Sequence, residues 1–334
     1  MNDYYKTFNI NLIKKGQNKI IINVENLKID FHIIISNIIK LITEFYPEIK
    51  IEFNDYNEKK NNKNFQIILT INKNDIHNEI INPDNNHLYF LDNYTTEITN
   101  NLFVKYNVIG LSIVGLLIKE ILYTKYNITI YTHQNSFGNI YDKVVNYTIL
   151  IDELYIFKND KLPIIDPRAK ILMQKLINKS INDKKVISGS LETIIYNLPK
   201  NLGNPYYNLF ESNLSRLLYL IPNLKSLEFA NVYKINNNYI QPYKNIYFNN
   251  DTLIYDSNVY YGVEQGITTS DIVSFNTHFI PPLAYTNKSA SINYKTLENI
   301  LIEPLNQNYF ILYKYIFQVE ALSAIAIYDM ILKK

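Results

Sequence analysis

The chain has 334 residues, of which 47% are hydrophobic and 19% charged, and a formal net charge of +2. This apolar content can fill a large buried core, which excludes an intrinsically disordered protein, and the balanced charge argues against nucleic-acid binding. The sequence contains no cysteine, which excludes a disulfide framework, a zinc–thiolate site and a cysteine nucleophile, and fits a reducing, cytoplasmic compartment.

The first hundred residues combine strand-like and helix-like patterns. Residues 6–13, 18–24 and 64–72 alternate apolar and polar side chains with a period of two, which predicts strands. Residues 33–45 carry an apolar stripe that predicts a helix, although their isoleucines would also suit a strand. Residues 57–64 and 82–87 are polar and are expected to be loops. No secretory signal pattern is present at the N-terminus.

The next segment predicts a long helix over residues 100–123. Its most apolar run, residues 108–118, is about half of what a bilayer requires, and Lys119 and Glu120 follow at once. We therefore expect a buried helix and no membrane association. A strand over residues 127–133 follows. Asp166 and Pro167 then form an N-cap followed by a proline in the first turn, which predicts a helix of about five turns.

The remaining chain alternates strands and helices. We predict a strand up to residue 196, a turn, a helix over 206–220, strands around a glycine-containing turn between 244 and 282, and a final amphipathic helix from residue 316. Strands and helices do not alternate with the period of about 30 residues that a doubly wound sheet requires. The pattern therefore predicts one α+β domain spanning residues 1–334.

The turn residues of the C-terminal half occur in a distinctive order. A glycine precedes a strand that contains one glutamate, and a Leu-Pro-x-x-Leu-Gly turn, a helix and an Ile-Pro corner follow: Gly189, Glu192, Pro199, Leu202, Gly203, Ile221, Pro222, Lys225, Glu228. Farther along are a glycine turn, a Phe-x-Pro strand end and the helix "QVEALSAIAIYDMIL": Gly262, Gly266, Ile267, Phe279, Pro281. This order resembles the chorismate synthase family, well from about residue 163 onward, weakly over 100–140 and poorly before 100.

The resemblance implies a fold, a reaction and an assembly. The fold would be α+β, with helices sandwiched between antiparallel β-sheets. The reaction would be that of a carbon–oxygen lyase, the 1,4-elimination of phosphate from 5-enolpyruvylshikimate 3-phosphate to give chorismate, with reduced FMN as cofactor. The protein would be a homotetramer that binds a small-molecule substrate, with neither nucleic acid nor membrane as a partner.

The resemblance also assigns site residues one by one. The family's Gly-Arg-His-Asp-Pro motif falls on residues 305–309, so Gln307 and Asn308 stand at its catalytic positions. His87 corresponds to a second family histidine in one alignment, whereas an ungapped count puts Pro83 there. Cofactor binding falls on four positions: Gly262, Gly266, Asn276 and Lys314. Substrate binding falls on Lys314 and Asn306.

A substrate with one phosphate and two carboxylates needs several cations, ideally guanidinium groups. Of five basic family positions only Lys314 keeps a positive charge, while the others fall on Asn276, Ile280, Asn306 and residues 102–106. Each charge-assisted hydrogen bond contributes roughly 1.5–3 kcal/mol, so four losses amount to about 6–12 kcal/mol. Compensating substrate-binding lysines would be the ones near the lost motifs, which are alternatively solvated surface lysines: Lys14, Lys15, Lys19 and Lys105.

Two functions therefore remain open. The chain is either a chorismate synthase with a rebuilt site, or a relative that keeps the fold, has lost catalysis and acts as a binding or structural protein. No metal-ligand spacing, P-loop or Rossmann fingerprint is present. His32, His77 and His133 are expected to have surface or capping roles, and His278 to be a hydrogen-bonded strand histidine.

Overall fold

The computed structural model describes residues 9–15, 19–27, 32–59, 62–71, 102–143, 160, 162–183, 185, 187–229, 246–249, 252–255, 262–269, 271–280, 289–293, 298–302 and 312–334. The chain divides into two compact units. The first comprises residues 1–117, 184–186 and 282–310, and the second comprises residues 118–183, 187–281 and 311–334. The sequence-based expectation of one domain over 1–334 stays a prediction.

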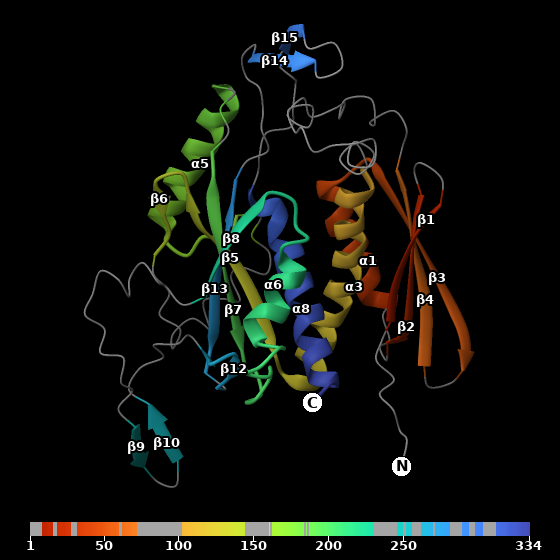
Figure 1. Ribbon diagram of the computed structural model, residues 1–334, viewed down its shortest axis with the longest axis vertical. Helices are drawn as coiled ribbons and strands as arrows, with labels where there is room; N and C mark the ends of the chain where they lie inside the picture. Colours follow the sequence, from red (N-terminus) through yellow and green to blue (C-terminus); the bar gives the residue numbers. More distant parts are fainter. Residues whose placement is uncertain are drawn as a thin grey trace. The chain divides into compact units, whose positions relative to one another are not determined.

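The first unit is built on a four-stranded antiparallel sheet with the order β1-β2-β4-β3. Its strands are β1 (Asn9–Lys15), β2 (Lys19–Leu27), β3 (Ile49–Lys59) and β4 (Asn62–Ile71). The period-two pattern of β2 and β4 puts every second side chain into the core: Ile20, Ile22, Val24, Phe65, Ile67 and Leu69. Helix α1 (His32–Phe45) and the first part of α3 (Leu102–Tyr126) lie against one face of this sheet (Figure 1).

Helix α3 approaches the sheet closely because residue 110 has no side chain. A Cβ on Gly110 would lie 2.3 Å from Cδ1 of Ile22 and 3.3 Å from Cδ1 of Leu69. A glycine inside a helix costs about 1 kcal/mol in propensity, which the packing of the helix on β2 and β4 offsets. The surrounding residues Val108, Ile109, Ile113 and Val114 are buried, so the predicted buried helix is confirmed.

Two helical segments, Tyr106–Tyr126 and Leu312–Leu332, are long and apolar enough to cross a bilayer by length and composition alone. Within them, 61% and 67% of the most apolar window is buried inside the protein. Core helices have the same properties, so this finding is weak support for a membrane span.

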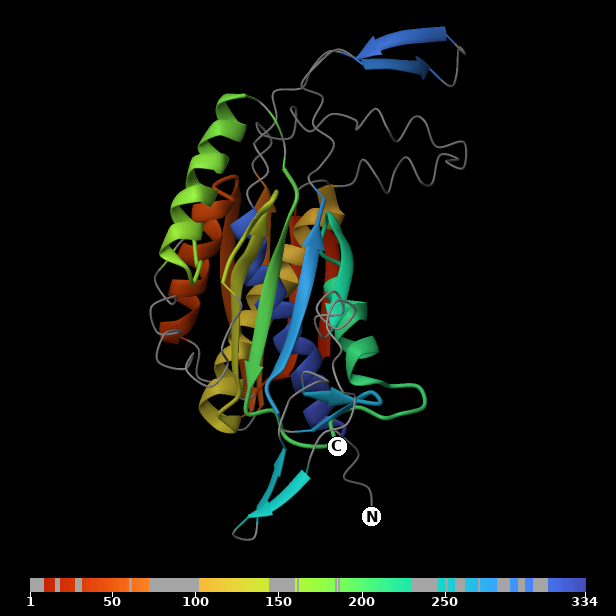
Figure 2. The ribbon, with the colours of Figure 1, turned by 90° about the vertical axis from the view of Figure 1, so that its left-hand side faces the viewer.

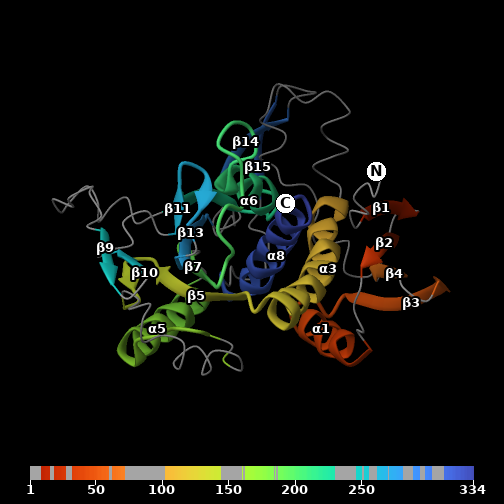
Figure 3. The same cartoon turned by 90° about the horizontal axis from the view of Figure 1, so that it is seen from below.

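The second unit contains a five-stranded antiparallel sheet with the order β6-β5-β7-β13-β8. The strands are β5 (Thr129–Phe137), β6 (Ile140–Tyr141), β7 (Gly189–Tyr196), β8 (Leu224–Phe229) and β13 (Val273–Phe279). Helix α8 (Ile316–Leu332) packs on β5 and β7, with α6 (Phe210–Leu218) beside it. Helix α5 (Pro167–Asn182) lies on the other side of the sheet, next to β6 (Figures 2 and 3).

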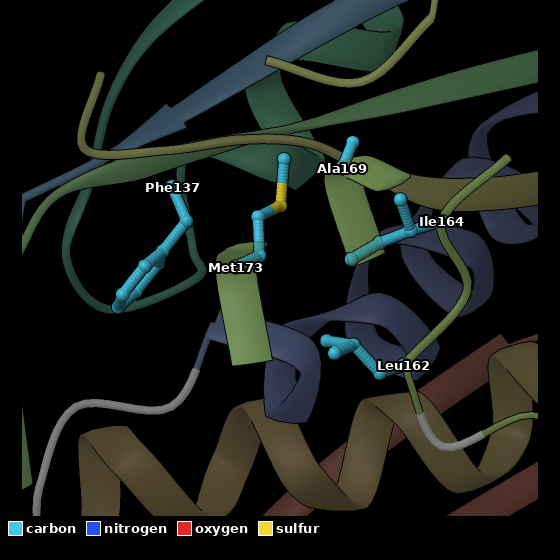
Figure 4. Packing of buried hydrophobic residues seen from close by; sticks show 5 residues of the cluster. All are labelled: Phe137, Leu162, Ile164, Ala169 and Met173. Carbon is cyan, nitrogen blue, oxygen red and sulfur yellow. The ribbon is translucent and has the colours of Figure 1, made fainter. Parts of the chain in front are cut away.

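Helix α5 begins as the sequence predicts and is fastened to β5 by a small apolar cluster. The Asp166 side chain accepts a hydrogen bond from Arg168 N at 2.8 Å, and Pro167 occupies the first turn. Phe137, at the end of β5, packs with residues that precede or belong to α5 (Figure 4): Leu162, Ile164, Ala169 and Met173. This cluster holds the start of α5 against the edge of the sheet.

Two sequence-based expectations were wrong. The loop expected over 57–64 is wrong for residues 57–59, which belong to β3, and for residues 62–64, which belong to β4. Helix α6 begins at Phe210 and not at residue 206, because a bridge between Asn204 and Asn208 and a hydrogen bond from Tyr206 N to Asn204 Oδ1 hold residues 204–208 in a turn. The expected loop at 82–87 lies outside the described residues.

The remaining described elements are hairpins and one short helix. The hairpins are β9 (Ile246–Asn249) with β10 (Thr252–Tyr255), β11 (Val263–Glu264) with β12 (Ile267–Thr268), and β14 (Ser289–Asn293) with β15 (Glu298–Ile302). The short 3-10 helix η3 (Leu312–Tyr315) leads into α8. The α+β class with antiparallel sheets is confirmed.

Candidate functional site

Polar side chains form one row across the five-stranded sheet. The strand register places His133 opposite Glu192, Glu192 opposite Asn276, and Asn276 opposite Glu228. Directly opposite residues of neighbouring antiparallel strands lie on the same face of a sheet. We call His133, Glu192, Asn276 and Glu228 the polar row.

His133 lies between two carboxylates. Its Nδ1 is 3.1 Å from Asp142 Oδ2, and its Nε2 is 3.0 Å from Glu192 Oε2. His133, Asp142 and Glu192 are 2%, 8% and 9% exposed, so all three lie away from bulk water. Ser274 donates a hydrogen bond to Glu192 Oε1 at 2.7 Å. The sheet therefore contains a buried, fully connected ionisable cluster.

Backbone N–H groups hold the Asp142 carboxylate. Its Oδ2 accepts from Ile165 N at 2.7 Å, and its Oδ1 accepts from Asp166 N at 2.8 Å and from Lys143 N at 2.7 Å. Hydrogen bonds from N–H donors favour the ionised form of a carboxyl group. Asp142 therefore supplies negative charge to one side of His133.

The surroundings of His133 raise its pKa. Burial alone would lower the pKa of this imidazole, because a buried charge loses its hydration. The hydrogen bonds and the charges of Asp142 and Glu192 act in the opposite direction and raise the pKa to about 9. The prediction of a surface or capping role for His133 was therefore wrong.

Asn276, a predicted cofactor-binding residue, lies in the polar row and is 6% exposed. Its Oδ1 accepts a hydrogen bond from Asn135 Nδ2 at 3.0 Å. Asn135 stands where the register between β5 and β7 shifts, and its Nδ2 is also 3.4 Å from Ser190 Oγ. Part of the Asn276 amide is thus engaged inside the sheet.

The predicted glycine turn makes close backbone contacts next to the start of β13. Gly262 and Gly266 have φ angles of +77° and +81°, which favour glycine. A Cβ on Gly262 would lie 2.7 Å from Ile272 O, and Gly266 O accepts a hydrogen bond from Phe210 N at 2.8 Å. The turn therefore connects β13 with the beginning of α6.

Lys314, predicted to bind both cofactor and substrate, lies in η3 near the far end of β13. The next residue, Tyr315, stacks on Phe279 with ring centroids 4.8 Å apart. Because β13 has seven residues, its ends are separated by about 20 Å. The glycine turn and Lys314 are thus at opposite ends of the strand, with Asn276 between them.

This separation bears on the cofactor. An FMN-binding site must hold a phosphate and cover a flat ring at one place. The described residues mapped to the cofactor are spread along β13, and Asn276 is buried, so these residues by themselves do not fit a flavin-binding pocket.

The other predicted site residues fall mainly outside the described part. Lys14 and Lys15 belong to β1 and Lys105 to α3, but their side chains are not described. Lys19 begins β2 opposite Lys15, in the first unit. The following residues lie outside the described ranges: His87, Asn306, Gln307 and Asn308. Their assigned roles stay predictions.

Sequence reasoning missed the partners of His133. A single glutamate in the otherwise apolar strand "SLETIIY" was the available signal, because a buried carboxylate requires a partner. The position of Asp142, nine residues after His133, depends on the β5–β6 turn and could not be read from the pattern. The prediction for His278 is confirmed, since its Nε2 is 3.3 Å from Glu228 Oε2.

Among the residues that the structure describes, no group of three histidine, aspartate or glutamate side chains is arranged to hold a metal ion.

Comparison with solved structures defines the fold class. The chain is similar to the crystal structure of a chorismate synthase, with a TM-score of 0.68 and 15% sequence identity. The match covers 98% of this chain and 92% of that one. The α+β fold of the chain is thus that of chorismate synthases.

Sequence comparison gives the family. The sequence model of chorismate synthase matches residues 107–332, which is more than half of the chain, and the chain therefore belongs to the chorismate synthase family. Curated relatives include the chorismate synthase of Methanocaldococcus jannaschii, 27% identical over 250 residues, or 67% of this chain. That of Methanococcus vannielii is 28% identical over 132 residues, or 39% of this chain. The matches span 62% and 35% of the two relatives, so less than two thirds of their length is covered.

Proposed function

We propose that the protein is a chorismate synthase. It would catalyse the 1,4-elimination of phosphate from 5-enolpyruvylshikimate 3-phosphate, using reduced FMN. The observation that carries this proposal is the family match over residues 107–332, supported by the similarity of the whole fold. The proposal extends to a cytoplasmic homotetramer whose partner is this small-molecule substrate, with neither nucleic acid nor a membrane involved.

The proposed site would depend on cations. Lys314 keeps a positive charge at a basic family position, near the N-terminal end of α8. One lysine does not balance one phosphate and two carboxylates. Activity therefore requires other lysines, for which Lys14, Lys15, Lys19 and Lys105 are the candidates, together with the polar residues Asn306, Gln307, Asn308 and His87.

One observation favours the alternative of a relative without catalysis. At a position where the family has arginine, this chain has Asn276, which is buried and accepts a hydrogen bond from Asn135. A neutral side chain engaged within the sheet contributes no charge to substrate binding. In that case the protein would be a binding or structural protein.

Anaerobic turnover distinguishes the two functions. Purified protein is supplied with reduced FMN and 5-enolpyruvylshikimate 3-phosphate, and chorismate and phosphate are measured together. Release of both in equal amounts supports the enzyme. If folded protein gives neither product, and titration shows no binding of FMN, the proposal is refuted in favour of the alternative.

Lys314→Ala tests the retained cation. We expect this variant to weaken substrate binding by about 1.5–3 kcal/mol, or roughly ten- to 150-fold in Kd, because one charge-assisted hydrogen bond is lost. The control is Lys333→Ala, since Lys333 is exposed and pairs with Asp329 on α8. Titration of each variant with substrate measures the effect. Equal affinities in the two variants would show that Lys314 does not bind the substrate.

A further inference from the structure

None of the three residues of the cluster His133, Asp142 and Glu192, which we call the ion triad, is among the positions assigned a catalytic, cofactor-binding or substrate-binding role above. Both ring nitrogens of His133 face a carboxylate oxygen, at 3.1 Å and 3.0 Å. A neutral imidazole has one N–H donor and one acceptor nitrogen, whereas an imidazolium has two donors. Only the protonated ring donates hydrogen bonds to both carboxylates at once.

The Asp142 side of the ion triad favours this protonation state. Backbone donors from Lys143, Ile165 and Asp166 already reach its two oxygens. In each of these three hydrogen bonds the carboxyl group of Asp142 is the acceptor, so both of its oxygens are engaged by N–H donors. The remaining proton of the triad therefore resides on His133 or on Glu192.

Charge balance favours His133. Ser274 donates to Glu192 Oε1, which again suits an ionised carboxylate. Two buried carboxylates without a cation would be very unfavourable. At the far side of the polar row His278 pairs with Glu228, and exposed titratable groups on α5 and β6 are Arg168, Lys175, Lys179 and Tyr141. The described neighbouring elements also carry these groups: Tyr131 on β5, Tyr196 on β7, Lys143 after β6, Asp166 before α5, the Asp160–Lys170 pair and the Lys119–Glu320 pair. The two pairs are internally neutral, and Lys143 is exposed.

We infer that His133 is an imidazolium in the native protein and that its proton fastens the start of α5 to the centre of the sheet, through Asp142 on one side and Glu192 on the other. Asp142 contacts the backbone of Ile165 and Asp166, immediately before α5. Glu192 belongs to β7, the middle strand of the sheet. Loss of one proton would thus weaken the connection between two elements.

The direction of the pH dependence follows from the raised pKa. The pKa of His133 is about 9 in the folded chain, compared with about 6.5 for a free histidine. The stabilisation is therefore complete below about pH 6.5 and is lost as the pH rises through about 9. Between these values the folding equilibrium constant is expected to fall by up to about tenfold per pH unit from this group.

Nitrogen NMR of the full-length protein with labelled histidines tests the protonation state directly. We expect one buried histidine, recognised by slowly exchanging ring N–H protons, to show two protonated ring nitrogens at pH 7.5, where free histidine is mostly neutral. This measurement needs no variant. A signal with one unprotonated nitrogen at pH 7.5 would place the proton on Glu192 and overturn the inference.

Variants test whether protonated His133 connects the start of α5 to the sheet. His133→Gln should remove the alkaline loss of stability and accelerate hydrogen exchange of the backbone amides of Ile165 and Asp166. The matched control is His278→Gln, which removes a histidine paired with Glu228 on the same sheet. It should retain both the alkaline loss and the slow exchange. Equal profiles for the two variants would overturn the inference.

A second variant, in which both carboxylates of the ion triad are replaced by neutral amides, provides a test if His133→Gln fails to fold. In the double variant Asp142→Asn, Glu192→Gln no buried carboxylate remains to hold the proton. We expect its histidine to titrate near or below pH 6.5 and its stability to be flat between pH 7 and 9. An unchanged alkaline loss in this variant would refute the role of the triad. The test is independent of catalytic turnover.

Discussion

At the scale of single residues, the carboxylate of Glu320 on α8 contacts two other elements, α3 and β5. Its Oε2 is 2.5 Å from Lys119 Nζ on α3, and its Oε1 accepts a hydrogen bond from Thr132 N at 2.9 Å. Thr132 lies in the part of β5 that β6 does not pair, because β6 pairs only with Ser136 and Phe137. Glu320 therefore supplies a hydrogen-bond acceptor to this strand N–H.

Glu320→Ala should lower the free energy of unfolding by about 1–3 kcal/mol, because the buried Thr132 N–H loses its acceptor. Glu320→Gln retains an acceptor oxygen and should lose less than about 1 kcal/mol, since the Lys119–Glu320 pair is partly exposed. Urea unfolding of both variants measures the difference. Equal losses would show that the ion pair, and not the strand N–H, determines the contribution.

Gly203→Ala should destabilise the protein by about 2–5 kcal/mol, because steric overlap and backbone strain add together. Gly203 has a φ of +97°, and a Cβ there would lie 2.2 Å from Gly266 O and 2.8 Å from Phe210 N. The control is Gly138→Ala, where φ is +59° and the nearest atom is a side-chain methyl of Ile187 at 3.1 Å.

For the Gly138→Ala control we expect a loss of about 1–2 kcal/mol, from backbone strain alone. Thermal unfolding of the two variants provides the comparison. A smaller loss at Gly203 than at Gly138 would contradict the close packing of this turn on the glycine turn that contains Gly266.

At the scale of elements, local signals were sufficient where the sequence itself carries the cause. The Asp166–Pro167 start of α5 and the buried run in α3 were predicted because caps and apolar runs act within a few residues. Strand β3 was missed, since its polar half is stabilised by pairing with β4. The start of α6 depends on the Asn204–Asn208 bridge. The periodicity of apolar residues along the sequence does not show which distant segments pair.

The candidate site was harder to predict than the fold for a similar reason. Family positions located Asn276 and Lys314 in the sequence, but their separation along β13 is a property of the folded sheet. His133 meets Glu192, 59 residues away, only because β5 and β7 are paired in that register. Contacts of this kind are not encoded by any local spacing.

Asp166→Ala tests the predicted cap of α5. We expect the free energy of unfolding to fall by about 1 kcal/mol, because Arg168 N loses its side-chain acceptor. Asp166→Asn should be nearly neutral, since the amide oxygen can accept the same hydrogen bond. Denaturant titration of both variants measures the effect, and a large loss in the asparagine variant would indicate that charge, and not capping, is what matters.

At the scale of the whole molecule, assembly is the main open prediction. The proposed homotetramer requires apolar surface, and the described residues include three exposed tyrosines and one exposed leucine before and after α6: Tyr206, Tyr207, Tyr219 and Leu220. Light scattering during size-exclusion chromatography should give four times the chain mass of 39.3 kDa. A single monomer peak at micromolar concentration would refute the tetramer, and the double variant Tyr206→Ser, Tyr207→Ser would test whether the exposed tyrosines before α6 contribute to assembly.

The position of α8 in the chain has a consequence for synthesis on the ribosome. The helix covers β5 and β7, yet it is translated more than a hundred residues after both strands. Ile130, Leu191 and Ile195, which are buried in the finished protein, therefore emerge before the helix that packs on these strands has been made. The nascent chain thus carries an uncovered sheet surface until α8 has been translated, and a chaperone that binds apolar strands would find its substrate there.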